Sequence, residues 1–342
     1  MAALCAAALA ACDPPSRGVD AGELHGVFDD AGPSAIASSS ARAPKAVPSG
    51  SASSAIVTQA RPPGDLGCVE TSGQPEAIRR TVGRPACRAS EVLEWRDPSG
   101  APRYACLYSP PELSKREPLP LVVFFHGSTP GLDDPTSVPK LTSLRSKLDA
   151  FDLTGRPSTK GFLLLAVQGR ALGKGSDGAS FDTAHVAADN LDKVTADRFV
   201  DVLLERGVAD AKRVYAVGMG SGAEMAATYA MLRPDRVAAF GGFAPSTPPA
   251  VWQCPGPPPP GFVAYRACDS VVSCESVELW LRARDKLGAE TKALRLGEDQ
   301  REEPNCTPKN KCSEKKGNTH HLRWPKGREA ELLRFLGSHA LQ

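Results

Sequence analysis

One short stretch of the sequence combines the residue types that nucleophilic chemistry needs. Residues 213–219 are rich in Val, Tyr and Ala and predict a buried strand, which runs through a glycine-rich corner into an Ala-rich helix. A sharp turn of this kind can lift a hydroxyl nucleophile above a sheet. Here the centre of the turn is Gly220, and the hydroxyl of Ser221 comes one residue later.

The spacing of small residues indicates which residue occupies the centre of this turn. The positions two residues on either side of the nucleophile must be small, because strand and helix approach closely there. With Gly220 at the centre these positions are Gly218 and Gly222, whereas with Ser221 one of them is Met219, whose side chain would crowd the corner. We therefore predict that Gly220 holds the nucleophile position and that Ser221 begins the helix.

Strands and helices alternate along the rest of the chain from about residue 100. Continuous apolar runs bounded by Pro or Gly predict strands buried on both faces, and amphipathic spacing predicts helices. The expected strands are 119–128, 161–168, 236–243, 261–267 and 292–296, the expected helices are 188–207, 276–287 and 328–339, and a hairpin is expected within 87–108 with its turn at 97–100. This alternation predicts one α/β domain, with a mainly parallel central sheet flanked by helices.

The order of these elements and several motifs resemble the α/β-hydrolases, specifically the polyhydroxybutyrate depolymerase and feruloyl esterase group of secreted esterases. The resemblance covers roughly residues 100–340. The matching segments are 124–127, 181–183, 197–198, 213–215, 234–239, 269–272 and 321–325. It implies an α/β-hydrolase fold and a site for carboxylic ester hydrolysis, with nucleophile, acid and histidine in that chain order. The sequence departs from the family at Gly220, where the family has its nucleophile.

The resemblance also implies the acid and the base of the site. Asp269 corresponds to the catalytic acid at a strand end, which orients the base. His321 corresponds to the base and is preferred to His320 because it lies nearer Trp324, although one extra residue separates it from that tryptophan. The choice between the two histidines stays open.

The same resemblance places the donors that would stabilise an oxyanion. The loop of His126, Gly127 and Ser128 follows a buried strand and supplies one amide, and Ser221 supplies another from the first turn of the helix. We expect His126 to shape this loop rather than to act as a base.

Three functions follow from these residues. Because Gly220 carries no oxygen, we expect a catalytically degenerate protein that keeps a pocket for a small-molecule or polymeric ester or a glycan-like ligand. The alternatives are an active serine carboxylesterase or depolymerase that uses Ser221, His321 and Asp269, and a non-catalytic surface scaffold. The sequence predicts no metal and no cofactor, and it determines neither the substrate nor the oligomeric state.

The N-terminal part of the chain has a different composition. Residues 1–12 are short, apolar and end in small residues, as the end of a signal peptide does, and they resemble a bacterial lipobox in which Cys12 is lipidated. Residues 13–65 are rich in Ala, Ser, Pro and Gly and predict a disordered linker. We expect an extracytoplasmic lipoprotein, in the periplasm or at the cell surface, that meets the membrane through its lipid alone and carries its folded domain in residues 66–342.

Net charge and cysteine content bear on nucleic-acid binding, disulfide formation and zinc binding. The net charge of +2 gives no support to nucleic-acid binding. Outside residues 1–12 the chain has an even number of cysteines, which predicts disulfides in an exported protein. The pairs Cys268/Cys274 and Cys306/Cys312 are close enough to close small loops, but the sequence does not determine the pairing. No cysteine spacing is typical of a zinc site.

Overall fold

The fold was analysed in a computed structural model of the chain. The structure describes residues 75, 77–87, 90–113, 116–128, 143–156, 159–172, 178–245, 258–307, 321, 324–325 and 327–342. The chain divides into two compact units, Met1–Thr58 and Gln59–Gln342, and all described residues belong to the second. The predicted signal segment with Cys12 and the predicted linker lie outside the described residues.

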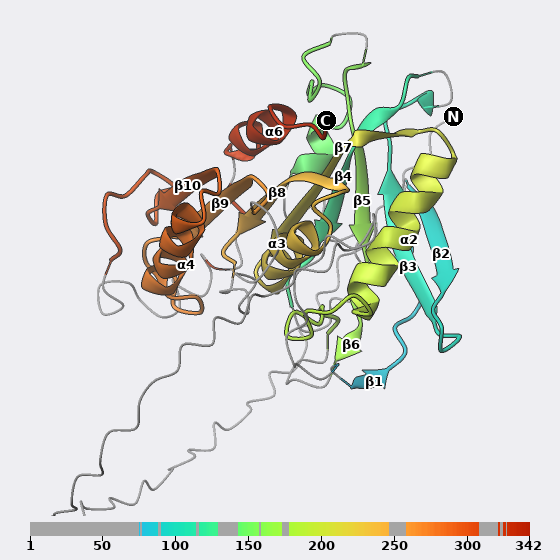
Figure 1. The fold of residues 1–342 in the computed structure, drawn as a ribbon, viewed down its shortest axis with the longest axis horizontal. Coiled ribbons are helices and arrows are strands. Elements are labelled where there is room, and N and C mark those ends of the chain that lie inside the picture. The colour runs from blue at the N-terminus through green and yellow to red at the C-terminus, as the bar shows by residue number, and fades with distance from the viewer. Residues whose placement is uncertain are drawn as a thin grey trace, which may run out of the picture. The chain divides into compact units, whose positions relative to one another are not determined.

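Among the described residues, the centre of the second unit is an eight-stranded sheet of order β10-β9-β8-β7-β4-β5-β3-β2 (Figure 1). The strands are β2 (Glu91–Arg96), β3 (Pro102–Tyr108), β4 (Leu119–Phe125), β5 (Leu163–Val167), β7 (Ala209–Met219), β8 (Val237–Phe243), β9 (Gly261–Arg266) and β10 (Thr291–Leu296). All neighbours from β10 to β5 pair in parallel, and β3 and β2 continue the sheet antiparallel. The mainly parallel sheet predicted from the apolar runs is therefore confirmed.

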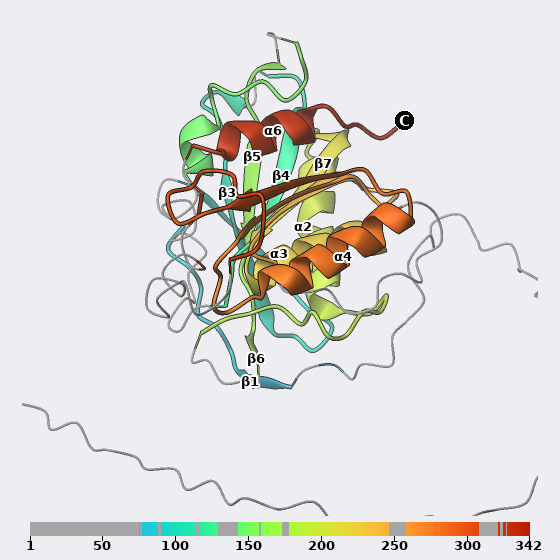
Figure 2. The ribbon, with the colours of Figure 1, turned by 90° about the vertical axis from the view of Figure 1, so that its left-hand side faces the viewer.

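Helices cover both faces of this sheet. The helices are α2 (Leu191–Glu205), α3 (Ser221–Leu232), α4 (Cys274–Lys286) and α6 (Glu329–Gly337), with a short 3-10 helix at Leu144–Lys147. Figure 2 shows α6 on one face of the sheet and α3 and α4 on the other. In β4, Leu121, Val123 and Phe125 face the core under α2, α3 and α4, while Val122 and Phe124 face the core under α6. This alternation explains why the strand is apolar at every position.

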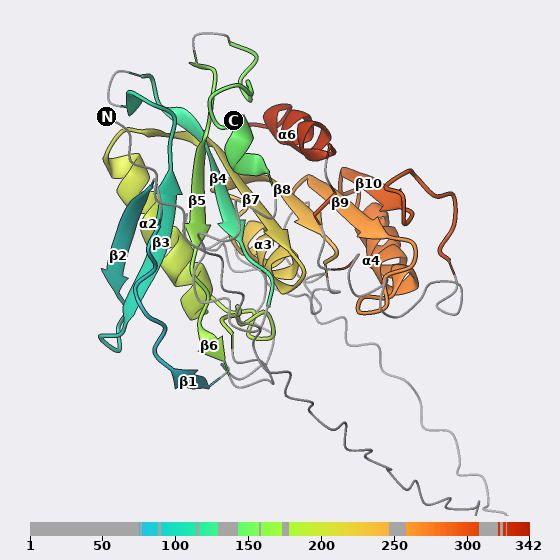
Figure 3. The same ribbon diagram turned by 180° about the vertical axis from the view of Figure 1, so that it is seen from behind.

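Helix starts follow local capping chemistry. The side chain of Asn190 accepts hydrogen bonds from the amides of Asp192 and Lys193, so Asn190 caps the start of α2. In α4, Ser273 is the N-cap and accepts from the Ser276 amide, so the helix begins at Cys274, two residues before the predicted start. A small antiparallel pair, β1 (Ile78–Arg80) with β6 (Ala171–Leu172), lies beyond the end of β5 and was not predicted (Figure 3).

Two glycines allow β7, α3 and β4 to meet without side chains between their backbones. A Cβ on Gly218 would overlap the carbonyl oxygen of Gly222. A Cβ on Gly222 would in turn overlap the carbonyl oxygens of Phe125 and His126. The start of α3 therefore packs directly on the end of β4 and on the loop that follows it.

We predict that Gly222→Ala destabilises the protein strongly, because the new methyl group would overlap backbone oxygens that cannot turn away. Overpacking typically costs about 1 to 3 kcal/mol, and overlap with backbone places this variant at the upper end or beyond. Gly83→Ala is the matched control, since a Cβ there meets nothing within 4 Å. Urea unfolding followed by circular dichroism measures both variants, and equal midpoints for the two would contradict the close packing at Gly222.

Candidate active site

The predicted corner lies at the carboxyl end of β7, in the middle of the sheet. Gly220 is the N-cap of α3 with φ 56° and ψ −127°, and its N–H donates to the carbonyl oxygen of Phe243 at 2.9 Å. Residues with a Cβ rarely adopt this conformation, and at active sites it typically stores about 1 to 3 kcal/mol of strain. Glycine adopts it freely, so the turn persists here without that strain.

Gly220 faces the predicted base. A Cβ built on Gly220 would lie 3.6 Å from Nε2 of His321 and 3.8 Å from the Cα of Gly127, both ordinary van der Waals distances. A hydroxyl one bond beyond that Cβ could reach hydrogen-bond distance of Nε2. The space between Gly220 and His321 would therefore hold a serine side chain, and the chain places no oxygen on residue 220.

The predicted acid and base form a hydrogen-bonded pair. Asp269 follows β9, is 4% exposed, and its Oδ2 lies 2.8 Å from Nδ1 of His321. Its other oxygen accepts the amides of Val271 and Val272 at 2.8 and 2.9 Å. These bonds fix the carboxylate, which favours a proton on Nδ1 of His321 and leaves Nε2 directed at Gly220 as an acceptor or, once protonated, as a donor.

His126 occupies a separate, buried position behind the corner. It is 1% exposed, its Nε2 lies 3.0 Å from the Gly169 amide, and its ring contacts Phe181 with centroids 4.9 Å apart. Because Nε2 accepts from that amide, the ring proton lies on Nδ1, which is 3.0 Å from the carbonyl oxygen of Gly127. His126 thus joins its own loop to the segment after β5.

Ser221 points at the loop after β4. Its Oγ accepts the Ser128 amide at 2.9 Å and lies 2.8 Å from Oγ of Ser128. Within the described part of the chain, Ser221 Oγ makes no other hydrogen bond, and none to His321. The structure therefore brings Gly220, His321 and Asp269 together and pairs Ser221 with Ser128. Apart from the expected nearness of both residues to the corner, no pattern in the sequence indicates this serine pair.

Trp324 holds the segment after His321 against the sheet. Its ring contacts Phe124 and Phe243, with centroid distances of 6.3 and 5.9 Å, and it is 4% exposed. It also lines a small pocket between the sheet and α6, formed with Gly242, Phe243, Phe262, Ala264, Pro325, Arg328 and Leu332. The predicted alternative base His320 and the segments 131–140, 173–177 and 248–257 lie outside the described residues.

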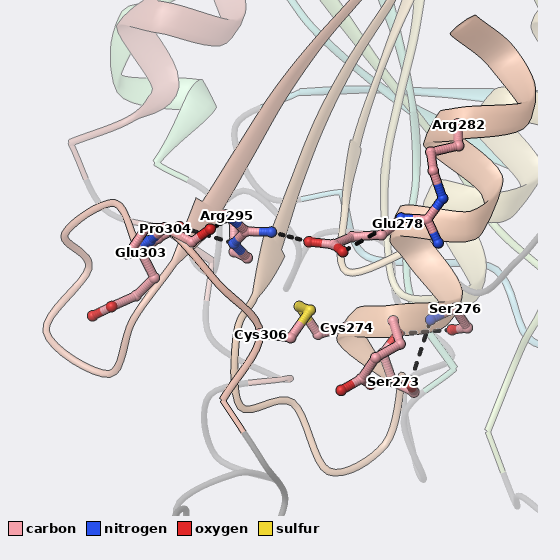
Figure 4. Close-up of a disulfide and its surroundings, with 10 residues drawn as sticks. Ser273, Cys274, Ser276, Glu278, Arg282, Arg295, Glu303, Pro304 and Cys306 are labelled. Atoms are coloured by element: carbon pink, nitrogen blue, oxygen red, sulfur yellow. Dashed lines mark hydrogen bonds and ion pairs between the residues drawn. A yellow bond between two sulfur atoms is a disulfide. The ribbon is translucent and has the colours of Figure 1, made fainter. Parts of the chain in front are cut away.

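A disulfide joins the start of α4, which follows Asp269 in the chain, to the segment after β10. Cys274, at the start of α4, is bonded to Cys306, which follows β10 and precedes His321 in the chain (Figure 4). The ion pair of Arg295 with Glu278 lies beside it, and Arg295 also donates to the carbonyl oxygens of Glu303 and Pro304. The segment before residue 308 is thereby fixed to α4 and β10.

The observed disulfides differ from the local pairs considered from the sequence. Cys274 and Cys306 bond to each other, so neither Cys268/Cys274 nor Cys306/Cys312 forms. A second disulfide joins Cys87 to Cys106 in β3. The short sequence spacing of the cysteines did not predict the pairing, because the fold brings the start of α4 beside the end of β10. Cys274 and Cys306 lie close to Glu278, but their sulfurs are joined and offer no thiolate to a metal.

The disulfides bear on where the protein resides. Disulfides persist in oxidising compartments, so these two indicate an extracytoplasmic location. Of the helices that the structure describes, none is both long and apolar enough to cross a membrane.

Comparison with known proteins identifies the fold. No protein-family model and no curated protein matches the sequence. A thermostable esterase of known structure aligns with a TM-score of 0.53 and 19% identity over 74% of this chain, which spans only 63% of that esterase's length. Esterase 2 of Thermogutta terrifontis aligns with a TM-score of 0.46 and 18% identity, over 64% of this chain and 86% of its own. The first similarity shows the fold alone, and it confirms the predicted α/β-hydrolase fold.

We predict that the Cys274–Cys306 disulfide supports the contact between His321 and Asp269. Replacing both cysteines by serine should lower the free energy of unfolding by about 3 to 4 kcal/mol, because the bond closes a loop of 32 residues. It should also weaken or remove the downfield NMR resonance of the His321 Nδ1 proton, since the segment leading to His321 loses its anchor.

Replacing Cys87 and Cys106 by serine is the matched control, because that disulfide closes a shorter loop of 19 residues away from the pair. Its removal should cost about 3 kcal/mol and leave the resonance in place. A resonance that survives in the Cys274/Cys306 variant under native conditions would show that the pair does not depend on the disulfide.

Proposed function

We propose that this protein is an esterase-like member of the α/β-hydrolase fold class that binds a ligand without forming an acyl-enzyme, because its nucleophile position is Gly220. The expected ligand is an ester, small or polymeric, or a glycan-like molecule, bound outside the cytoplasm. One observation carries the proposal: the Cβ direction of Gly220 leads to Nε2 of His321 at 3.6 Å. The base therefore faces the position where a serine hydroxyl would stand in an active enzyme.

The remaining groups have defined roles in this proposal. Asp269 orients His321, and His321 presents Nε2 to the bound ligand. The amino end of α3 begins beside Gly220, and the positive end of a helix favours a ligand oxygen, although the amides of Ala223 and Glu224 already donate to the carbonyl oxygen of Gly220. Without an attacking oxygen these groups bind and polarise a ligand, while covalent turnover falls by about six orders of magnitude relative to a complete triad.

A second candidate function rests on Ser221. Its hydroxyl lies at the first residue of α3, next to the corner, so a serine carboxylesterase that uses Ser221, His321 and Asp269 remains an alternative. That mechanism requires Ser221 Oγ to leave both of its bonds with Ser128 and to turn towards His321. The geometry favours the first proposal because residue 220, and not residue 221, faces Nε2.

We predict that Gly220→Ser creates esterase activity. The new hydroxyl would start from a Cβ already within 3.6 Å of Nε2, so His321 could deprotonate it. We expect kcat/KM for p-nitrophenyl acetate to rise by at least about a thousandfold over the wild type. This gain is smaller than the rate difference between a complete triad and one without its nucleophile, because the residues around position 220 have not been selected to activate a serine there. Labelling of residue 220 by a fluorophosphonate probe, located by mass spectrometry, gives the second measurement.

Gly220→Ala is the matched control, because it adds the same Cβ at the same positive φ without the oxygen. Both variants should lose about 1 to 3 kcal/mol of stability from backbone strain, and only the serine variant should gain activity. Wild-type protein should resist the probe. Labelling of wild type at Ser221, abolished by Ser221→Ala, would establish the second candidate instead.

Attachment to the membrane is part of the same proposal. If Cys12 is lipidated, Cys12→Ser should move the protein from the membrane fraction to the soluble extracytoplasmic fraction, because no other anchor is proposed. Immunoblots of fractionated cells measure this, with and without globomycin, which blocks lipoprotein processing. An unchanged distribution in the variant would reject the lipid anchor.

A further inference from the structure

Only one of the two hydroxyl hydrogens of Ser128 and Ser221 is used in the bond between them. Ser128 and Ser221 together carry two hydroxyl hydrogens, and one of them lies in the bond between the two oxygens. Ser221 Oγ also accepts a hydrogen bond from the Ser128 amide, and this bond uses neither hydroxyl hydrogen. Whichever serine donates within the pair, the other hydroxyl hydrogen has no acceptor among the described residues and can be donated to an outside oxygen. Ser128 is exposed and Ser221 is half-buried, so that oxygen can come from a ligand.

The second group at the corner is His321, whose Nε2 is an acceptor in the neutral ring and a donor when the ring is protonated. Asp269 holds Nδ1, so only Nε2 faces the space above Gly220. Because residue 220 has no side chain, a ligand atom can stand where a serine would place its Cβ and Oγ. Nothing in the described structure comes closer than 3.6 Å to that Cβ position apart from the glycine itself and its chain neighbours.

These donors suit an anionic ligand with two acceptor oxygens. A carboxylate can place one oxygen on protonated Nε2, with the positive charge of the imidazolium facing Asp269 on its other side. Its second oxygen can accept a hydrogen bond from the remaining serine hydroxyl, beside the amino end of α3, where the helix favours negative charge. Charge-assisted bonds of this kind are the stronger ones, so the corner should prefer an anion to a neutral molecule of the same shape.

An ester or an amide fits the same donors less well. Its carbonyl offers one strong acceptor, and its second position carries an alkoxy oxygen or an amide group rather than a second anionic oxygen. One of the two donors is then poorly matched, and no charge is neutralised. We infer that the Gly220 corner is a receptor for a carboxylate group, either of a small organic acid or of the acidic end of a polymer. This inference rests on the proposed function, because a working serine at residue 220 would occupy the same space.

The test compares acids with neutral molecules of matched shape. Acetate and benzoate, each beside its amide and its methyl ester, are titrated into the folded wild-type protein by isothermal titration calorimetry, with the His321 ring resonances followed by NMR. We expect each acid to bind at least tenfold more tightly than its amide or ester and to shift the His321 resonances. Acetate measures the binding of a carboxylate group with only a methyl substituent. Benzoate measures the binding of a carboxylate that carries an aromatic ring.

Three variants locate the binding. His321→Gln and Gly220→Ala should both reduce the preference for acids at least fivefold, the first by removing the charged donor and the second by filling the corner. His339→Gln is the control: His339 pairs with Glu290 at 3.2 Å, and its carbonyl oxygen accepts the hydroxyl of Tyr215. This variant should leave the preference unchanged. Thermal unfolding shows whether each variant is folded.

The outcomes separate this inference from the proposal on which it rests. Equal binding of acid and amide by wild type, or a preference that survives in folded His321→Gln, overturns the carboxylate receptor. Either result leaves the proposed function standing if Gly220→Ser gains esterase activity. Fluorophosphonate labelling of wild type at Ser221 would instead overturn the proposed function, whatever the acids do.

Discussion

At the corner between β7 and α3, three backbone segments approach so closely that side chains are excluded from two positions. Gly218 and Gly222 permit this approach, and a Cβ on either would overlap a carbonyl oxygen of the opposing segment. Gly220, with its positive φ, lies between these two glycines in the chain. The corner therefore keeps the shape of a nucleophile site for reasons of backbone packing, independently of whether residue 220 carries an oxygen.

The acid–base pair is held from the opposite side of the corner. Asp269 is almost fully buried, and a buried carboxylate needs hydrogen-bond donors, which two backbone amides and His321 supply. The pair therefore contributes to the stability of its own loop as well as to any chemistry. The Asp269–His321 pair opposite Gly220 is consistent with ligand binding as much as with catalysis. Whether the site can catalyse ester hydrolysis therefore depends on the residue at the nucleophile position.

The sequence alone was sufficient to predict the structural features that depend on short local patterns of residues. Apolar runs located the sheet strands from β4 to β10, and the glycine spacing placed Gly220 and not Ser221 at the turn. Features that depend on distant segments could not be found this way. The Cys274–Cys306 bond requires knowing that α4 begins beside the end of β10, and the start of α4 depends on a cap by Ser273. The Ser128–Ser221 bond and the packing of Trp324 on Phe243 likewise join segments far apart in the chain.

Glycine at residue 220 changes the energetics of the site in two directions. It avoids the strain that a serine would store at φ 56°, a conformation that favours glycine. It also leaves room beside Nε2 of His321 for an atom that does not belong to the chain. In a serine esterase that room is filled by the enzyme's own oxygen, and the ligand oxygens compete with it for donors. In the function that we propose, these groups serve the ligand alone, which favours retention of a bound group over its covalent turnover.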